Sequence, residues 1–277
     1  MTTIGLLHPG EMGAMVGASA RADGARVLWS SEGRGPATRR RAEAAGLEDA
    51  GTLAELVRRS EVILSVCPPD AAVDVARTVA AARFRGLYVD GNAVSPRTAR
   101  EIGSIIEKGS ATFVDGGIIG GPPQKRGTTR LYLSGVAAAR VAALFPKGPL
   151  EAIVVAGGPG AASALKMAYA AWNKGSAALL MAVRALAIAE GVADALLDEW
   201  KLSQPDLPPR SEAAVKRNAP KAWRFVGEME EIAATFAAAG LPGGFHQAAA
   251  EIYRRLASWK DAEPPSVAEA SKALAKK

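Results

Sequence analysis

The sequence contains few of the residues on which disulfide-stabilised, metal-binding and aromatic-rich proteins depend. Of its 277 residues one is cysteine, Cys67, and two are histidine. A single cysteine excludes an internal disulfide framework and is typical of a reducing compartment, and the isolated His8 and His246 do not make a metal site. Aromatic residues make up only 5% of a chain that is 49% hydrophobic. With alanine dominant, this composition favours closely packed helices over an aromatic-rich β sandwich.

Long apolar runs and a strong charge of one sign are also missing. The most apolar stretch, residues 177–189, contains Arg184 and is too short to span a bilayer. The first residues lack the charged and then apolar segments of a secretory signal. The net charge is +6, and the one tight basic cluster, residues 39–41, is not interleaved with aromatic residues as a nucleic-acid platform would be. We therefore expect a cytoplasmic protein with no membrane or nucleic-acid partner, whose positive charge favours an anionic cofactor or substrate.

Short apolar segments alternate with helical ones through the first part of the chain. Residues 4–7 predict a strand, a turn with two glycines follows, and a helical segment leads to a second strand at residues 26–29. These are the dimensions of a βαβ unit. Further strands are expected at residues 62–66, 86–89, 112–114 (ending at Asp115), 130–133 and 152–155. The alternation predicts an α/β Rossmann fold with a largely parallel, doubly wound sheet.

The pattern changes at the glycine-rich segment 157–160. Residues 161–190 contain no proline and a single glycine, which predicts a helix of about thirty residues. Beyond it the chain has helical stretches separated by proline and glycine, without a strand-like run. We therefore expect a nucleotide-binding domain at residues 1–158 and an all-α domain at residues 159–277.

The turn after the first predicted strand has the character of a pyrophosphate site. Gly10 would let the backbone approach the phosphates, and Gly13 would let the next helix pack on the sheet. The start of that helix offers N–H groups and a positive dipole end to an anion. His8 stands at the first position of the usual three-glycine pattern, so a purely structural turn is the alternative. The residues expected to contact a dinucleotide here are His8, Pro9, Gly10, Glu11, Met12 and Gly13.

The end of the second predicted strand distinguishes the two nicotinamide cofactors. NAD sites usually place an acid there for the ribose 2′-hydroxyl, whereas this strand ends without a carboxylate. Hydroxyl and guanidinium groups suit a 2′-phosphate instead, which predicts NADP, with NAD as the alternative because Glu32 is close by. The residues at 39–41 are interpreted as a solvated helix start, with Arg39 or Arg40 as secondary cations. The side chains expected to bind the phosphate are Ser30, Ser31 and Arg34.

Four segments, in the same order, resemble the β-hydroxyacid dehydrogenase superfamily, which includes 3-hydroxyisobutyrate and 6-phosphogluconate dehydrogenases and whose architecture the imine reductases share. The resemblance covers the first 190 residues, and the rest resembles a branch whose C-terminal domain was long described as of unknown function. It implies a nicotinamide cofactor, with Cys67 and Pro68 as further contacts, although the thiol itself is interpreted as a packing group. The segments are residues 4–13, residues 89–96, residues 115–121 with Gly127 and Thr128, and residues 158–160 with Lys166.

Lys166 is the expected catalytic residue. A lysine among apolar neighbours is desolvated, which lowers its pKa, and it could then exchange a proton with the substrate oxygen. The alternative is a lysine that extends into solvent at a helix start. The dehydrogenases have asparagines three and four residues after this lysine; here Tyr169 stands at the first position, and Asn173, one turn further on, could replace part of that role. Tyr169 could instead donate a proton, as tyrosine can in imine reductases.

Two other segments modify this expectation. Asn92 is expected to contact the substrate and the cofactor, or alternatively to stabilise its loop through an Asx turn. Ile119 replaces the serine with which the dehydrogenases bind a carboxylate. In the C-terminal half, the family's Lys–Asp pair is absent. Glu228 is interpreted as part of a solvated helix face, with a polar group in the cleft as the alternative, and His246 is left open.

The expected function is hydride transfer between NADP and a small hydroxy acid, alcohol or carbonyl compound bound between the domains. The alternatives are an imine or enamine reductase and a non-catalytic NADP-sensing protein. The predicted long helix is too apolar for the surface of one small domain, and with the resemblance it predicts a homodimer. The apolar residues that carry this argument are Leu179, Leu180, Val183, Leu186 and Ala187.

Overall fold

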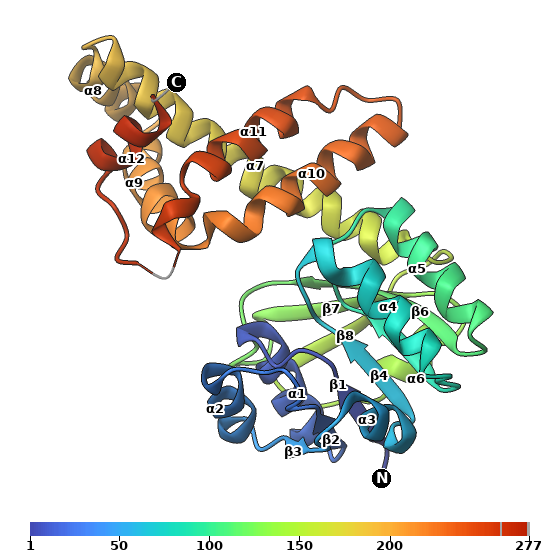
Figure 1. Cartoon of the computed structure of the whole chain (residues 1–277). Coiled ribbons are helices and arrows are strands. Elements are labelled where there is room, and N and C mark those ends of the chain that lie inside the picture. The colour runs from blue at the N-terminus through green and yellow to red at the C-terminus, as the bar shows by residue number, and fades with distance from the viewer. Residues whose placement is uncertain (261, 276–277) are drawn as a thin grey trace. The chain divides into compact units, whose positions relative to one another are not determined.

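The computed structural model describes residues 1–260 and 262–275 and contains two compact units, Met1–Met167 and Ala168–Lys277 (Figure 1). The first unit is built on an eight-stranded sheet in the order β3-β2-β1-β4-β5-β6-β7-β8. All neighbouring strands pair in parallel except β6 and β7, which are antiparallel. The strands are β1 (Thr3–Leu6), β2 (Arg26–Trp29), β3 (Glu48–Asp49), β4 (Val62–Ser65), β5 (Leu87–Asp90), β6 (Thr112–Ile119), β7 (Thr129–Ser134) and β8 (Leu150–Val154).

Helices cover both faces of this sheet, so the expected doubly wound Rossmann fold is confirmed. One apolar core joins the sheet to α1 (Glu11–Ala22), α2 (Pro36–Ala44) and α6 (Ala138–Ala142). A second core, on the opposite face, joins it to α3 (Leu53–Arg59), α4 (Ala72–Ala81) and α5 (Pro96–Lys108). Successive strand residues alternate between the cores, because side chains along a strand point to opposite faces: Val62 and Leu64 lie in the first core and Ile63 in the second.

The order of the strands determines where a ligand can bind. The chain passes from β1 outward to β2 and β3, and then returns to place β4 on the other side of β1. Helices α1 and α3, which precede and follow this reversal, lie on opposite faces. In open α/β sheets the crevice at such a reversal, beyond the carboxyl ends of the strands, is the usual ligand site. Here the reversal lies between β1 and β4, so a ligand is expected in a crevice beyond the carboxyl ends of these two strands.

The second unit is helical, and no strand follows β8 in the described part of the chain. The long helix α7 (Ala161–Ala189) confirms the expected thirty-residue helix; it begins in the first unit and continues into the second. None of the described helices is long and apolar enough to cross a membrane. The other helices are α8 (Ala193–Ser203), α9 (Leu207–Asn218), α10 (Ala222–Ala238), α11 (Gly244–Arg255) and α12 (Val267–Leu274), with 3₁₀ turns at Pro69–Ala71, Ala219–Lys221 and Ala257–Trp259.

Two strands differ from the sequence expectation. The short edge strand β3 was not predicted, because two charged residues, Glu48 and Asp49, carry no strand signal. Strand β6 was predicted to end at Asp115 but continues to Ile119. The extension forms because residues 115–119 pair with the antiparallel strand β7, an interaction that the glycines at 116 and 117 conceal in the sequence.

Candidate cofactor and active site

The turn between β1 and α1 has the geometry of a phosphate-binding turn. A side chain at Gly13 would place its Cβ 2.1 Å from the His8 carbonyl oxygen, so this position excludes any residue larger than glycine. A Cβ at Gly10 would meet open space, which leaves room for a ligand against the backbone. Gly10 is also the N-cap of α1 and supplies no side chain to cap it. The start of α1 therefore presents backbone N–H groups and a positive dipole end to the crevice.

Arginines surround the adenosine side of this turn. Arg34 donates a hydrogen bond from Nη2 to the Leu7 carbonyl oxygen at 3.3 Å, and Arg39 donates to the Ser31 carbonyl oxygen at 3.0 Å. Arg41 donates from Nε to the Pro9 carbonyl oxygen at 3.3 Å and is half-buried. The interpretation of residues 39–41 as a solvated helix start is therefore wrong for Arg41, because α2 turns its side chain onto the phosphate-binding turn.

The acids near this side are held in specific contacts. The Glu32 carboxylate accepts a hydrogen bond from the Leu53 N–H at 3.1 Å, so it caps α3. Asp49, from β3, accepts hydrogen bonds from the Ser31 N–H at 3.2 Å and the Gly51 N–H at 2.8 Å. Burial by itself would raise the pKa of Asp49, but these hydrogen bonds outweigh burial and lower the pKa below its usual value. The strand that the sequence did not predict thus brings a carboxylate to Ser31.

Ser30 and Ser31 are buried, and Ser30 donates from Oγ to the Gly51 carbonyl oxygen at 3.0 Å. Their hydroxyls therefore belong to the packed end of β2, where they would border an adenosine ribose. Of the three residues expected to bind the 2′-phosphate, only Arg34 has a positively charged side chain.

Two polar atoms beside the turn support a phosphate ligand. Within the described chain, neither His8 Nδ1 nor Arg34 Nε has a hydrogen-bond partner, and both atoms are buried. Burial lowers the pKa of His8 to about 4, and the positive charge of Arg34 acts in the same direction. A buried donor without a partner costs about 1–3 kcal/mol, more when it is charged. An anion at this position would satisfy both groups, so the residues present fit the phosphates of a dinucleotide.

The ends of β4 and β5 are joined by Asn92. Its Oδ1 accepts from the Cys67 N–H at 2.5 Å, and its Nδ2 donates to Ser65 Oγ and to Asp90 Oδ2, each at 3.1 Å. Asn92 is only 2% exposed. Its amide thus stabilises the loop through these contacts and not through the Asx turn offered as the sequence alternative, and it fixes the turn that contains Cys67 and the exposed Pro68.

Burial changes the ionisation of two groups in this region. It raises the pKa of the Cys67 thiol to about 12, and the nearby Asp90 carboxylate adds to the effect, so the thiol stays protonated, in agreement with a packing role. Burial also raises the pKa of Asp90 to about 7; the charge of Asp115 adds to this, while the hydrogen bonds from Asn92 oppose it. Asp90 and Asp115 face each other in the register of β5 and β6.

Asp115 fastens the start of α7 to the sheet. Its Oδ2 accepts from Ser134 Oγ at 2.9 Å, from the Gly160 N–H at 2.9 Å and from the Ser163 N–H at 3.1 Å. Its Oδ1 accepts from Ser163 Oγ at 2.6 Å. Asp115 is fully buried, and its carboxylate therefore acts as an N-terminal cap for α7 from a neighbouring strand.

Lys166 lies on the helical turn that Asp115 fixes. Its Nζ donates to the Ile118 carbonyl oxygen at 2.7 Å, and the side chain is half-buried. The close approach of α7 to β6 depends on Gly117, where an added Cβ would lie 2.9 Å from both the Ala162 carbonyl oxygen and Lys166 Cβ. The structure therefore holds the ammonium group at the end of β6 and does not extend it into solvent.

The remaining expected residues lie in the second unit. Tyr169 is 46% exposed, and Asn173 donates from Nδ2 to the Tyr169 carbonyl oxygen at 3.1 Å. The interpretation of Glu228 as part of a solvated face is wrong, because its side chain is largely buried and forms an ion pair with Lys174 of α7. His246 is buried between Phe236 and Phe245, which makes it a packing residue of α11.

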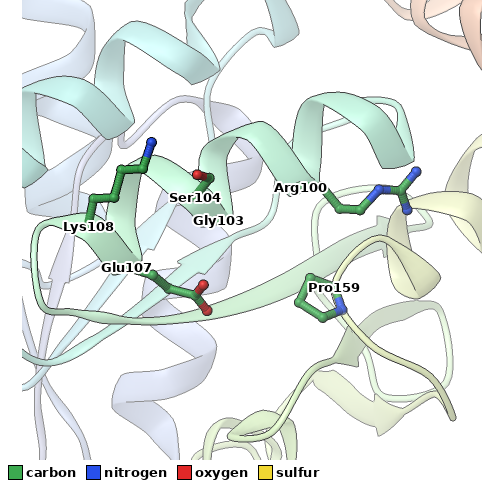
Figure 2. Close-up of a pocket in the computed structure, with 6 residues that line it drawn as sticks. All are labelled: Arg100, Gly103, Ser104, Glu107, Lys108 and Pro159. Atoms are coloured by element: carbon green, nitrogen blue, oxygen red, sulfur yellow. The ribbon is translucent and has the colours of Figure 1, made fainter.

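Figure 2 shows a pocket between α5 and the segment before α7 that contains Pro159. Basic, acidic and small side chains share it, and the expected cofactor and substrate residues are not among those that line it. The part of the chain that the structure describes also contains no group of three or more acidic, histidine or cysteine residues that could hold a metal ion. The pocket is lined by Arg100, Gly103, Ser104, Glu107, Lys108 and Pro159.

Sequence reasoning missed several residues that organise the site. Asp115 lies in one of the segments that resemble the family, but its residue type assigns it no role, and its position ahead of two glycines is the available signal. Asp90 carried a similar signal at the end of a predicted strand. Asp49 and Arg41 had none, because their contacts with Ser31 and Pro9 depend on how β3 and α2 pack.

Comparisons with known proteins agree with this geometry. The family model described as the NAD binding domain of 6-phosphogluconate dehydrogenase matches residues 2–146. A domain of unknown function matches residues 187–256. An uncharacterised 28.5 kDa protein of Methanothermus fervidus is 33% identical over 177 residues, which are 64% of this chain and 67% of that protein.

Solved structures share the fold over nearly the whole chain. A conserved protein of unknown function, described as structurally similar to 3-hydroxyacid dehydrogenases, is 28% identical with a TM-score of 0.68, covering 93% of this chain and 97% of its own. A 3-hydroxyisobutyrate dehydrogenase of Mycobacterium tuberculosis is 22% identical with a TM-score of 0.73, covering 100% of both chains. An imine reductase of Streptomyces aurantiacus is 20% identical with a TM-score of 0.54, also covering 100% of both.

Proposed function

This chain belongs to the family defined by the NAD-binding domain of 6-phosphogluconate dehydrogenase, and we propose that it is an NADP-dependent oxidoreductase. Its reaction is hydride transfer to or from a carbon that carries a hydroxyl or carbonyl group in a small substrate. The contact of Lys166 with the Ile118 carbonyl oxygen is the observation that carries the proposal. It keeps an ammonium group on a helical start that Asp115 makes rigid. We also propose that the protein acts in the cytoplasm, because its half-buried Cys67 suits a reducing compartment.

The preference for NADP is supported by the charges around the β1–α1 turn. The pyrophosphate would lie against Gly10 and the first turn of α1. Arg34 would hold the 2′-phosphate beside Ser30 and Ser31, and Arg41 would add positive charge. Glu32 does not oppose this arrangement because its carboxylate caps α3. Cys67 and Pro68 would border the nicotinamide half of the cofactor.

Lys166 is proposed as the general acid and base. The cofactor, when bound, supplies or accepts the hydride. During carbonyl reduction Lys166 gives a proton from Nζ to the substrate oxygen, and in the reverse direction the neutral amine takes it back. The Ile118 carbonyl oxygen orients the ammonium group before substrate arrives, which reduces the cost of positioning it.

Asn92, Tyr169 and Asn173 have supporting roles in this proposal. Asn92 maintains the loop between β5 and α5, and its contact with substrate would require an exchange of one of its present hydrogen bonds. Tyr169 and Asn173 follow Lys166 on the same face of α7 at helical spacing. Their side chains would contact the substrate from α7.

An imine or enamine reductase is the second candidate, and Tyr169 is the observation that favours it. Its phenol is 46% exposed and thus accessible to a ligand. Ile119, buried at the end of β6, removes the hydroxyl that a carboxylate substrate would use. A substrate without a carboxylate, such as a cyclic imine, does not need this hydroxyl.

A substrate panel tests the proposal directly. Hydroxy acids, sugar acids, ketones and cyclic imines are mixed with NADP or NADPH, and turnover is followed by absorbance at the NADPH band. Turnover of a hydroxy or carbonyl compound supports the first candidate, and turnover of imines alone supports the second. If the protein binds NADPH but turns over nothing in the panel, the non-catalytic sensing function gains support.

A homodimer is also proposed. Trp172, Leu179 and Leu186 are 70%, 50% and 62% exposed and recur every seven residues along α7. Large apolar side chains in one stripe favour burial against another molecule. Sedimentation at micromolar concentration should give twice the mass of the chain, and Leu179→Glu should give the monomer. A monomeric wild-type protein would contradict the proposal.

A further inference from the structure

His8 departs from the phosphate-binding pattern in a way that changes the chemistry of the turn. Its backbone does what the pattern requires: the His8 carbonyl oxygen accepts from the Gly10 N–H at 2.8 Å and packs against Gly13. The side chain is an addition, because the position it occupies is usually glycine. An imidazole here is half-buried, directly beyond β1 and before α1.

The imidazole and the neighbouring guanidinium are both incompletely hydrogen-bonded. Arg34 uses Nη2 to reach the Leu7 carbonyl oxygen, one residue before His8. In the described structure Arg34 Nε and His8 Nδ1 are buried polar atoms that find no partner. Arg34 belongs to the segment after β2, where the adenosine ribose lies in this fold.

The charged groups around His8 are predominantly positive. Arg34 acts on it from the β2–α2 segment, and Arg41 from α2 contacts the adjacent Pro9. The Cys67 thiol on the β4 side is neutral, and Glu11 in the first turn of α1 is the acid close in sequence. This environment disfavours a protonated imidazole until an anion offsets it.

We propose that His8 and Arg34 together hold the 2′-phosphate of the cofactor, with the His8 ring supplying a hydrogen bond that glycine at this position cannot. The inference rests on the proposed NADP function and adds a residue that determines the choice between NADP and NAD. The phosphate would satisfy both partnerless atoms at once. Its negative charge would also offset Arg34 and allow His8 to bind a proton, so the pKa of His8 should rise when the phosphate is bound.

The two histidines of the chain make this measurable by NMR. Ring resonances of His8 and His246 are followed against pH in the whole protein, alone, with 2′,5′-ADP and with ADP, which lacks the 2′-phosphate. We expect 2′,5′-ADP to raise the pKa of His8 from about 4 toward the ordinary value near 6.5. ADP should leave it nearly unchanged, and His246, buried in the other unit, should respond to neither ligand.

Binding to variants gives a second readout. His8→Gly restores the usual pattern and should bind 2′,5′-ADP about tenfold more weakly, the usual worth of one hydrogen bond to a charged group, with ADP binding unchanged. His8→Gln keeps a side-chain donor and should recover part of the loss. If 2′,5′-ADP binds without moving His8, or if His8 responds equally to ADP, the role of His8 is contradicted while NADP binding stands. If 2′,5′-ADP does not bind, the NADP preference itself fails.

Discussion

The two ends of the crevice are built on opposite principles. At the adenosine end, Arg34, Arg39 and Arg41 make hydrogen bonds to carbonyl oxygens, while two buried polar atoms of the described chain lack partners. At the proposed catalytic end, the Asp115 carboxylate accepts hydrogen bonds from Ser134 on β7 and from the start of α7. Hydrogen bonding is thus incomplete at the adenosine end and complete around the Asp115 carboxylate.

The difference matches what each end must do. A site that binds a charged ligand reversibly can leave hydrogen-bonding capacity for the ligand, and some of the cost of the partnerless groups is recovered on binding. A group that transfers a proton must stand within hydrogen-bond reach of its target in every cycle, which requires a rigid support. Mutations at the catalytic end should therefore reduce turnover or stability, whereas mutations at the adenosine end should change cofactor affinity.

Lys166→Ala should give the largest effect. The loss of a positioned acid and base lowers turnover by about 10²–10⁴-fold, which corresponds to about 3–5 kcal/mol in the activation barrier. Cofactor affinity should change little, because the proposed phosphate contacts lie at the β1–α1 turn, whereas Lys166 donates to the Ile118 carbonyl oxygen at the end of β6. Steady-state kinetics on a substrate from the panel, together with NADPH titration by fluorescence, measure both quantities.

Lys166→Met is the matched control for packing. Methionine is closer to lysine in volume, so a similar loss in both variants isolates proton transfer from the loss of side-chain contacts. Near-normal rates in both would show that another donor acts. Tyr169→Phe would then be the first variant to examine.

Asp115→Ala should destabilise the fold by about 3–5 kcal/mol, because it leaves buried donors at Gly160 and Ser163 without an acceptor. Urea unfolding measures the change. Arg34→Ala, at the incomplete end, should change the free energy of unfolding by less than about 1 kcal/mol. Equal effects of the two substitutions would remove the contrast between the ends of the crevice.

The sequence predicted those parts of the fold and site that depend on local pattern. The strands around residues 4–7 and 62–66, the glycine turn and the helix from residue 161 follow from apolar periodicity and glycine position, and the structure contains all of them. The role of Asp115 could not be predicted, because its hydrogen bonds to Ser134, Gly160 and Ser163 link segments up to 48 residues apart.

The errors have the same origin. The ion pair between Lys174 and Glu228 joins α7 to α10, so the acidic helix pattern alone favours a solvated face and does not reveal this partner. Likewise, the approach of Asp49 to Ser31 depends on a two-residue strand that forms through its pairing with β2. In each case a contact between distant segments determines the role, and the residue types alone do not.

Asp90 should give the catalytic end a pH-dependent stability. Its pKa is about 7 in the folded protein, against an ordinary carboxyl value of 3.8. Between these values the unfolded chain has lost the proton that the folded protein still binds, so the free energy of unfolding should fall by about 1.4 kcal/mol per pH unit as pH rises. Urea unfolding from pH 4 to pH 8 measures this slope.

Asp90→Asn isolates the contribution of this group. Asparagine cannot ionise, so the difference in unfolding free energy between wild type and variant should change with pH across this window and level off above pH about 7. Asp74→Asn, whose side chain is 78% exposed, is the matched control and should leave the pH dependence of the wild type intact. A constant difference between wild type and Asp90→Asn would contradict the raised pKa.

Arg34→Gln should give the smallest of these changes in free energy, a change in cofactor binding, and it tests the adenosine end of the site. It removes the guanidinium from beside Leu7 and His8, so NADPH should bind about 5- to 150-fold more weakly, equivalent to about 1–3 kcal/mol. NADH affinity should hardly change, because NADH has no 2′-phosphate for Arg34 to contact. Arg77→Gln, an arginine of α4 whose side chain is 60% exposed, is the matched control and should leave both affinities unaltered. Fluorescence titration of the two reduced cofactors against each variant measures the selectivity. Equal losses for NADPH and NADH in Arg34→Gln would mean that Arg34 acts on the pyrophosphate and not on the 2′-phosphate, and the cofactor preference would then have to depend on Arg39 or Arg41.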